Sequence, residues 1–476
     1  MSYRVPQHID SNKIFIVNRS EIQGRLDPKM ALYNRKVQNW AYPKVRLKDI
    51  LLAKPQYGAA ESGVARTNKL SPRYLRITDI DEYGLISHDD LGATANTLED
   101  QYILHANDLL IARSGATVGK AYIHKDCPYT CFFAGYLIRF IINPLKALPD
   151  YIFAFTQSNT YKEWVNAIQR PSGQPNINAE EYQSLEIPMP PVDIQEKVVS
   201  LIRKAYSEKK SKDLEAQQLL DSIDTYLLNE LGVSLPDYHT DLKDRIFTIN
   251  RKTLDYRWDP YFSLKYFRDA FTALESCKYP IVNLKNIVIL ITSGVTPRAG
   301  GDAYTEDKEV GVPFVRSGNI SIEGNLNFDD LLYLKPEIHD TLMRSSQLQK
   351  NDILIAIVGA TIGQVGIYLY DGEANINQAI ALVRLKDGYD VQFIKELIKS
   401  SIGQLSLNRL KRPVARANIN LEEISTIKVV LPPLDKQQEI AQHIASIRQQ
   451  AKILQEEGKR ILEDAKLEVE QMILRE

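Results

Sequence analysis

Residues 170–197 read RPSGQPNINAEEYQSLEIPMPPVDIQEK, and a closely similar stretch, RPVARANINLEEISTIKVVLPPLDKQQE, occupies residues 412–439. Asn-Ile-Asn, Glu-Glu and Pro-Pro recur in the same order, with a shift of 242 residues from Asn176 to Asn418. This repeated stretch predicts that the segments on either side of it also occur twice.

Further blocks confirm the repeat along the whole chain. They keep their order with small insertions between them, which identifies a tandem duplication of a unit of about 240 residues. The matched pairs are FIVNRSEIQGRLDP with FTINRKTLDYRWDP (15–28 and 247–260), YPKVRLKDI with YPIVNLKNI (42–50 and 279–287), RITDI with RSGNI (76–80 and 316–320), and NDLLIARSGATVG with NDILIAIVGATIG (107–119 and 351–363).

The first part of each unit has the pattern of a mixed globular domain. Apolar, β-branched runs at 109–112 and 353–358 lead into Gly-Ala-Thr-x-Gly, with Asn-Asp before them as turn punctuation. Residues 150–169 and 389–410 have helical patterns. We therefore expect an α+β domain that occurs twice.

The second part of each unit is predicted to be one long helix. The Pro-Pro pair blocks a helix from continuing through it, and Asp193 or Asp435 can cap the helix that follows. At 1.5 Å per residue each helix would be about 60 Å long. In the second copy, small and apolar residues alternate in steps of four and three, as in a coiled-coil seam: Ile440, Ile444, Ile447, Ala451, Leu454, Gly458, Ile461 and Ala465.

These long helices are expected to pair with each other as an antiparallel coiled coil, with a globular domain at either end. The alternative is that each helix packs back on its own domain. The predicted division of the chain is a first globular domain with its N-terminal extension (1–190), a central long helix (191–232), a linker (233–245), a second globular domain (246–432) and a C-terminal long helix (433–476).

Composition excludes several classes of protein. The 476 residues carry a net charge of −1, so nucleic-acid contacts would have to come from local patches. Three cysteines offer no disulfide framework, which favours a reducing compartment. The first ten residues lack the apolar segment of a signal peptide, and apolar runs are too short for a membrane helix. We expect a cytoplasmic protein.

The duplicated layout, together with NDLLIARSGATVG and NDILIAIVGATIG and the two Asn-Ile-Asn to Pro-Pro stretches, resembles the specificity subunits of type I restriction–modification systems. The resemblance covers nearly the whole chain. It implies a non-catalytic subunit whose two domains each read half of a split, asymmetric sequence in double-stranded DNA. It also implies that the helices bind modification subunits, two adenine methyltransferases that carry S-adenosylmethionine, and that restriction subunits can join. No cofactor is then expected in this chain.

The DNA-contacting candidates are cations, amides and one serine in polar loops. The two globular domains that carry them are called the first and the second head. Arginine, asparagine and glutamine can read base edges, whereas lysine and arginine also bind phosphates. In the first head they are Arg66, Lys69, Arg73, Arg76, Arg113, Ser114, Lys120, Arg170 and Gln174. In the second head they are Arg298, Arg316 and Asn319, and then Arg409, Lys411, Arg412 and Arg416 from a basic stretch at 401–420 without a carboxylate. The identical Asn-Ile-Asn segments favour a structural role, because the halves should read different bases.

The helices carry the candidate residues for partner assembly. These are the apolar positions that would form the paired-helix surface: Val198, Leu219, Ile223, Ile444, Ile447, Leu454 and Ile461.

Enzymatic sites have little support in the sequence. The Gly-Ala-Thr-x-Gly loops lack the Lys-Ser/Thr that ends a P-loop, which favours a tight turn between strands. Cys127 and Cys131 lack a second ligand pair, and His124 alone does not complete a zinc site, so no metal site is predicted. No catalytic residue is predicted. A solitary nuclease or modification enzyme, and a protein-binding scaffold that does not read DNA, remain the alternatives.

Overall fold

The computed structural model describes residues 16–17, 27–37, 40–87, 90–169, 175–238, 241, 246–249, 257, 259–298, 301–412 and 417–474. The chain divides into two compact units. Unit 1 comprises residues 1–214 and 454–476, and unit 2 comprises residues 215–453. The two long helices therefore each contribute one half to either unit.

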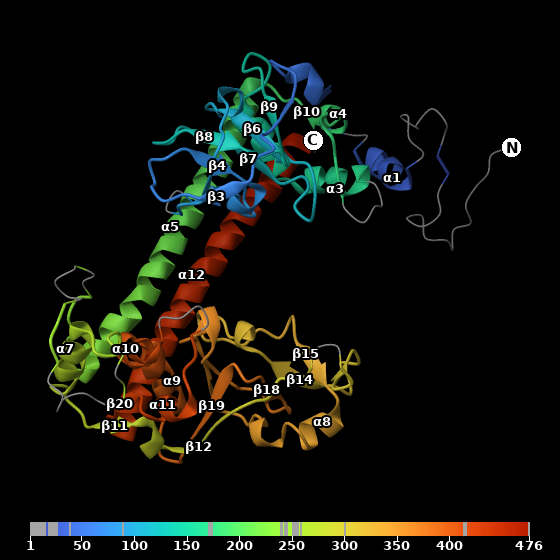
Figure 1. Ribbon diagram of the computed structural model, residues 1–476. Coiled ribbons are helices and arrows are strands. Elements are labelled where there is room, and N and C mark those ends of the chain that lie inside the picture. The colour runs from blue at the N-terminus through green and yellow to red at the C-terminus, as the bar shows by residue number, and fades with distance from the viewer. Residues whose placement is uncertain are drawn as a thin grey trace. The chain divides into compact units, whose positions relative to one another are not determined.

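Unit 1 contains a mixed α+β head (Figure 1). Its main sheet has the strand order β2-β9-β6-β7, and three two-stranded sheets pair β1 with β10, β3 with β5 and β4 with β8. The strands are β1 (Lys44–Arg46), β2 (Gln56–Tyr57), β3 (Gly63–Ala65), β4 (Arg73–Leu75), β5 (Ala93–Ala95), β6 (Asp108–Ala112), β7 (Ala121–Ile123), β8 (Cys131–Phe133), β9 (Leu137–Ile141) and β10 (Glu186–Pro188). The helices are α1 (Pro28–Lys36), α2 (Pro149–Thr156), α3 (Asn159–Ile168), α4 (Ala179–Gln183) and the first part of α5 (Val192–Leu231).

Unit 2 repeats this plan. Its sheets have the orders β12-β19-β16-β17 and β13-β15-β14-β18, with a further pair β11-β20. The strands are β11 (Ile281–Asn283), β12 (Val288–Ser293), β13 (Tyr304–Thr305), β14 (Val312–Val315), β15 (Leu332–Leu334), β16 (Ile353–Ala356), β17 (Val365–Ile367), β18 (Asn375–Ile376), β19 (Ile380–Leu385) and β20 (Lys428–Val430). The helices are α7 (Lys265–Leu274), α8 (Pro336–Asp340), α9 (Val391–Lys399), α10 (Ser401–Leu410), α11 (Leu421–Ser425) and the first part of α12 (Leu434–Leu474).

Matching sequence blocks occupy matching places in the two heads. The Asn-Asp pair before β6 and β16 supplies a left-handed residue, with φ of 75° at Asn107 and 76° at Asn351. The aspartate that follows is buried and forms an ion pair with an arginine of the neighbouring strand. The O···N distance is 3.3 Å for Asp108–Arg139 and 2.7 Å for the equivalent pair in unit 2. The repeat therefore extends to buried polar contacts.

A buried glutamine explains the Pro-Pro-x-x-x-Gln pattern at the start of each long helix. In unit 2, the Gln437 side chain donates to Pro432 O at 2.8 Å and accepts from Asp390 N–H at 3.0 Å. Gln195 makes the same two contacts in unit 1, to Pro190 O at 2.9 Å and from Leu148 N–H at 2.9 Å. Each glutamine thus fastens the start of a long helix to the helix that follows the central sheet.

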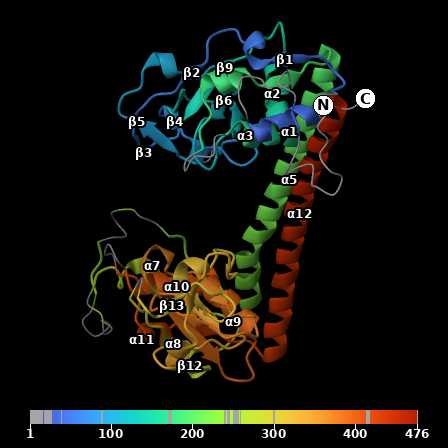
Figure 2. The ribbon, with the colours of Figure 1, turned by 90° about the vertical axis from the view of Figure 1, so that its right-hand side faces the viewer.

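Helices α5 and α12 pack side by side in antiparallel directions (Figures 1 and 2). In unit 1, Lys212 Nζ lies 2.6 Å from Glu457 Oε2. In unit 2, Lys436 Nζ lies 2.7 Å from Glu230 Oε2. The start of α12 thus meets the end of α5 in unit 2, and the middle turns of both helices meet in unit 1. The predicted antiparallel pairing is confirmed.

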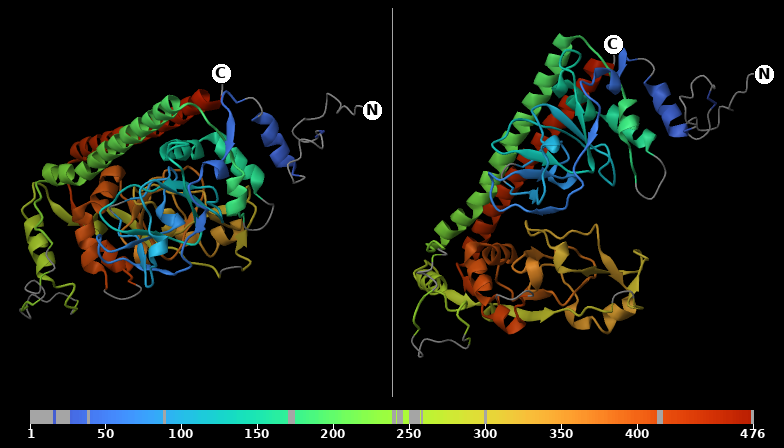
Figure 3. Two further views of the ribbon diagram at one scale, coloured as in Figure 1. Left: turned by 90° about the horizontal axis from the view of Figure 1, so that it is seen from above. Right: turned by 45° about the horizontal axis from the view of Figure 1, so that its top comes forward.

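Residues of both long helices also belong to the cores of the heads. Each helix therefore packs on the other helix and on the globular domains, so both packing alternatives of the sequence analysis apply. Val198 and Leu462 belong to the core of unit 1, and Ile223 and Ile444 belong to that of unit 2. Helix α9 of unit 2 lies beside α12 (Figure 3), where Arg448 forms a 2.7 Å ion pair with Glu396. Each head therefore rests on half of either helix.

Gly458 allows a close approach of the two helices in unit 1. A Cβ built at this glycine would lie 3.3 Å from Lys209 Cγ and 3.4 Å from Lys209 Cα. The absence of a side chain lets the backbone of α5 lie against α12 at this turn. The predicted seam thus includes glycine for a steric reason.

The α+β tandem fold with paired long helices is confirmed. Within the described ranges, no helix has both the length and the apolar character needed to cross a membrane. The division into recognition domains, helices and linker stays a prediction. Most of the N-terminal extension, and residues 239–240 and 242–245 of the linker, lie outside the described residues.

Candidate functional site

In both heads, the Asn-Ile-Asn segment holds the Gly-Ala-Thr-x-Gly loop. In the first head this loop joins β6 to β7. Ile177 N–H donates to Arg113 O at 2.8 Å, and Gly115 N–H donates to Pro175 O at 3.0 Å. The second head repeats both bonds with N···O distances of 3.0 Å. Two segments about 60 residues apart in each repeat therefore form one local structure.

The loop is a turn between antiparallel strands, as the sequence analysis favoured. Strands β6 and β7 pair through Leu109↔Ile123, whereas a P-loop leads from a strand into a helix. Gly119 has a φ of +86°, and a Cβ there would lie 2.7 Å from the Val165 side chain. The glycine is needed for both backbone angle and space.

The second asparagine of each Asn-Ile-Asn segment caps a short helix. Asn178 Oδ1 accepts from Glu181 N–H at 2.8 Å, and the Glu181 carboxylate accepts from Asn178 N–H at 3.0 Å. Asn420 and Glu423 form the same reciprocal pair, with the same two distances. These are capping boxes, which confirms a structural role for these two asparagines.

Two candidates for DNA contact in the first head are corrected, because they are interior residues. Arg66 is 3% exposed and Arg73 is 1% exposed. Arg66 donates to Leu91 O at 3.0 Å and to Lys69 O, and its guanidinium lies 4.2 Å from the centre of the Tyr129 ring. Arg73 donates to Ser87 O at 2.6 Å and to Tyr129 Oη at 3.2 Å. Both side chains are enclosed and hold the loops of the head together.

Arg76 and Arg316 occupy the same position in the two heads. Arg76 pairs with Asp79 at 3.0 Å and keeps 43% of its side chain exposed, whereas Arg316 donates to Asp330 O at 3.0 Å and keeps 38% exposed. Asn319 is corrected to a structural residue, because it is buried and its Oδ1 accepts from Arg316 N–H at 2.9 Å. Both arginines therefore keep part of their side chain at the surface.

The loop cations of the first head are half-buried. The Arg113 guanidinium lies 4.9 Å from the centre of the Tyr57 ring, and Lys120 Nζ donates to Ile80 O at 2.8 Å. Ser114 forms a backbone bridge with Asn176. The exposed candidates are Lys69 in the first head and Arg298 in the second.

One cation of the basic stretch that precedes α11 has a carboxylate partner in the fold, which corrects the interpretation of this stretch as an acid-free strip. Arg412 donates to the Glu423 carboxylate at 2.9 Å. Arg409 donates to Phe262 O at 3.0 Å and stacks 3.9 Å from that ring. Lys411 donates to Asn408 Oδ1 at 2.7 Å, and burial lowers its pKa. This stretch contributes mainly to packing of the second head. The remaining candidates, Arg170, Gln174 and Arg416, lie outside the described residues.

The seven helix positions proposed for partner assembly lie in the seam or against the head cores. Four of them, Val198, Ile223, Ile444 and Ile447, are buried, and the other three are half-buried: Leu219, Leu454 and Ile461. Their apolar surface is therefore largely used within this chain.

A charged cluster fixes α9 to α12 in unit 2. Burial alone would raise the pKa of Glu396, but the adjacent Lys395 and Arg448 cations hold it below its ordinary value. Burial, together with repulsion from Arg448, lowers the pKa of Lys399 to about 8. The Lys399 ammonium also donates to Glu323 O. Three cations, Lys395, Lys399 and Arg448, therefore surround the buried carboxylate of Glu396.

Sequence reasoning missed two arrangements. The paired glutamines Gln195 and Gln437 had a usable signal, because Gln follows Pro-Pro at the same distance in both copies. The group of His124, Cys127 and Cys131 was set aside, although its ligand atoms all lie within 4.8 Å of one another. Its signal was His-x-x-Cys-x-x-x-Cys, a spacing without a second ligand pair.

Comparisons with known proteins agree with the duplicated fold. A family model described as the type I restriction modification DNA specificity domain matches residues 81–219 and 305–463. The specificity subunit of the type I restriction enzyme EcoBI from Escherichia coli is 31% identical over 145 residues, a segment that spans 30% of each chain. The MjaVIII specificity subunit from Methanocaldococcus jannaschii is 21% identical, over 79% of this chain and 80% of its own. A solved structure concerned with complex assembly and conformational transition of the type I R-M system has a TM-score of 0.50 at 14% identity, and the match covers 91% of this chain and 97% of that one.

Proposed function

Because this chain belongs to the family of type I restriction–modification DNA specificity domains, we propose that it is a non-catalytic subunit that reads a split, asymmetric sequence in double-stranded DNA. The observation that carries this proposal is the duplication of the head together with its helix joint. One chain holds two heads of the same plan, and their loops differ in sequence. Two related but different heads are suited to two different half-sites.

Base contacts are assigned to the loops in which the heads diverge. Arg76 and Arg316 share one position and remain partly exposed, so they suit phosphate contacts that place both heads in a similar register. Arg298 and Lys69 lie on exposed loops of different sequence. Arginine is the side chain that reads guanine bidentately, so Arg298 is the foremost candidate for a base contact in the second head.

The paired helices are proposed to hold the modification subunits. Because the seam residues are used between α5 and α12, the outward faces are left for two adenine methyltransferase subunits. S-adenosylmethionine would bind those subunits, and restriction subunits would join the same assembly. Relatives carry the name of specificity subunits of type I restriction enzymes, which supports an assembly of this kind.

The test is to map methylated adenines in the DNA of cells that express this chain with the methyltransferase encoded beside it. The expected result is methylation at one motif with two specified halves and an unspecified gap. Cells that express the methyltransferase alone are the control. Methylation that does not depend on this chain, or cleavage or methylation by the chain alone, would overturn the proposal.

A second experiment tests which half of the motif is read by the second head. Arg298→Ala is expected to relax the sequence requirement within one half of the motif and to leave the other half unchanged. Arg73→Lys is the matched variant in the interior of the first head, and it should affect stability before specificity. Loss of both halves together in Arg298→Ala would place this residue outside base readout.

A further inference from the structure

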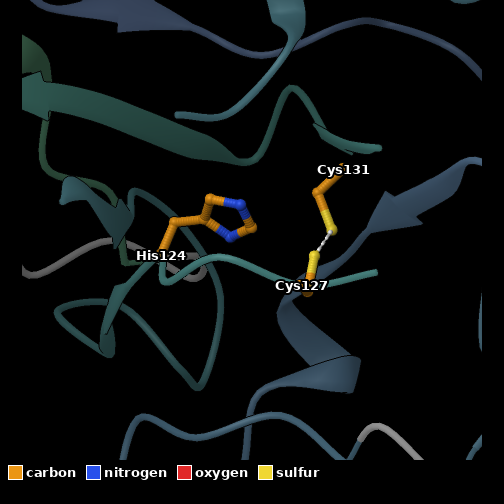
Figure 4. Close-up of side chains that lie close together, drawn as sticks. All are labelled: His124, Cys127 and Cys131. Carbon is orange, nitrogen blue, oxygen red and sulfur yellow. Dashed lines mark hydrogen bonds between the residues drawn. The ribbon is translucent and has the colours of Figure 1, made fainter. Parts of the chain in front are cut away.

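Three metal-ligating side chains meet inside the first head (Figure 4). His124, Cys127 and Cys131 place one ligand atom each within 4.8 Å of the others. The two sulfur atoms are 3.6 Å apart, which is too far for a disulfide bond of about 2.05 Å. His124 is 4% exposed and Cys131 is 1% exposed, while Cys127 is half-buried.

The strands on either side bring these side chains together. His124 directly follows β7, Cys131 begins β8, and Cys127 lies in the connection between these strands. Strand β8 is held in parallel register with β4 through Arg73↔Cys131. The Tyr122 hydroxyl lies 3.0 Å from His124 Nδ1, and such a contact orients a histidine ring, as hydrogen-bond partners of metal-ligating histidines do.

The second head has other residues at this place. Leu104 N–H donates to Cys131 O in the first head, and Leu348 N–H donates in the same way to Ala374 O in the second. Strand pairing likewise equates His124 with Tyr368, since Leu109↔Ile123 in the first head corresponds to Ile353↔Ile367 in the second. Tyr368 and Ala374 pack in an apolar cluster of unit 2. The common fold therefore requires no metal donors here, and among the described residues such a group of donors is found in the first head.

We propose that His124, Cys127 and Cys131 bind a Zn²⁺ ion. In a tetrahedral site with Zn–S bonds of about 2.3 Å, two ligating sulfurs lie about 3.8 Å apart, close to the 3.6 Å found here. Thiolate and imidazole donors favour zinc over magnesium or calcium, which take oxygen ligands. Two thiolates also neutralise the charge of the ion, as a largely buried site requires.

The ion would act as a structural clamp. It would tie the end of β7 to the start of β8 across residues 124–131, beside the interior arginines Arg66 and Arg73. The three side chains fill three of the four tetrahedral positions, and the fourth ligand is to be identified by the measurement below. This inference does not depend on the proposed function in DNA recognition.

The experiment measures zinc in the purified full-length chain after dialysis against metal-free buffer that contains a non-thiol reductant. About one zinc per chain is expected. X-ray absorption at the zinc edge should show two sulfur ligands at about 2.3 Å and nitrogen or oxygen ligands at about 2.0 Å. Co²⁺ added to the metal-depleted wild-type chain should give a thiolate-to-cobalt charge-transfer band, a readout that requires no substitution.

The variant Cys127→Ser with Cys131→Ser is expected to lose the zinc. Cys277→Ser is the matched control, because the Cys277 thiol donates to Tyr279 O at 3.0 Å just as Cys127 donates to Tyr129 O at 3.0 Å. This control should keep its zinc. Where the double variant is unfolded by circular dichroism, the spectra of the wild-type chain decide the question alone.

Three results would overturn the inference. The first is a reduced wild-type chain that binds neither zinc nor cobalt. The second is zinc coordinated without sulfur, which would be an adventitious ion only. The third is a Cys127–Cys131 disulfide in place of the metal in chain purified under reducing conditions.

Discussion

Gln437→Met tests the joint between the second head and its long helix. Glutamine and methionine have similar volumes and similar helix propensities, so the substitution chiefly removes the polar atoms of a side chain that is 2% exposed. Pro432 O then loses a donor at 2.8 Å, and Asp390 N–H loses an acceptor at 3.0 Å. The expected result is a destabilised unit 2 whose fold is kept.

The magnitude follows from the burial of the two orphaned groups. Pro432 O is enclosed, so leaving it without a donor should lower the free energy of unfolding by about 2 kcal/mol. Asp390 N–H is partly accessible to water, so leaving it without an acceptor should cost about 1 kcal/mol. The sum of about 3 kcal/mol corresponds to a Tm lower by about 6 °C for a unit of about 240 residues. Gln195→Met should lower the stability of unit 1 by a similar amount, because the same two contacts are lost there.

The assay combines differential scanning calorimetry with amide hydrogen exchange. Exchange should rise at the start of α9 in Gln437→Met and at the start of α2 in Gln195→Met, each without a change in the other unit. Gln438→Met is the control, because Gln438 is the exposed neighbour in the same helix. A Tm for Gln437→Met within about 1 °C of that control would refute the reasoning, since a buried group left unpaired should cost more than that.

Three further perturbations follow from other contacts. Asn420→Ala removes the capping box and should lower stability by about 1–2 kcal/mol in urea unfolding; an unchanged midpoint would contradict the capping role. In the folded chain the pKa of Lys399 is about 8, below its ordinary 10.5. Between these two pH values the unfolded chain binds more protons than the folded chain, so this group makes the free energy of unfolding rise with pH. Lys399→Met should remove that rise and raise stability at pH 7 by about 1–2 kcal/mol, a value reduced for partial exposure, and equal pH profiles of the two proteins by calorimetry would refute it. Leu454→Asp with Ile461→Asp should separate the helix pair and abolish assembly with the methyltransferase, measured by co-purification, while near-ultraviolet circular dichroism of the heads persists; intact assembly would refute the proposal that the paired helices hold the modification subunits.

Local patterns sufficed for the parts of this protein that depend on neighbours in the chain. The spacing of Ile440, Ile444, Ile447 and Ala451 predicted the seam because helical periodicity places these residues on one face. The identity of Asn-Ile-Asn in both copies predicted a structural role for Asn178 and Asn420, and the structure shows that each caps a short helix. The duplication was visible because both copies kept the same turn residues and the same helix joint.

The candidate site was predicted less well, because the exposure of a charged side chain depends on segments distant in sequence. Arg66 and Arg73 read as loop cations, yet Leu91, Ser87 and Tyr129 enclose them. The stretch around Arg412 looked free of acid, yet Glu423 lies within ion-pair distance. Burial and ion pairing depend on the folded chain, and a local sequence pattern does not predict them.

By itself, the sequence determined the twofold repeat, the α+β class of the heads and the two helices with their seam, because each rests on periodicity, turn chemistry or repetition within a few residues. Tertiary structure alone decided which arginines are exposed, that Gln195 and Gln437 fasten the helices to the heads, and that His124 lies beside Cys127 and Cys131. Those contacts join strands and loops through long-range pairing, and their energies depend on burial that only the assembled core creates.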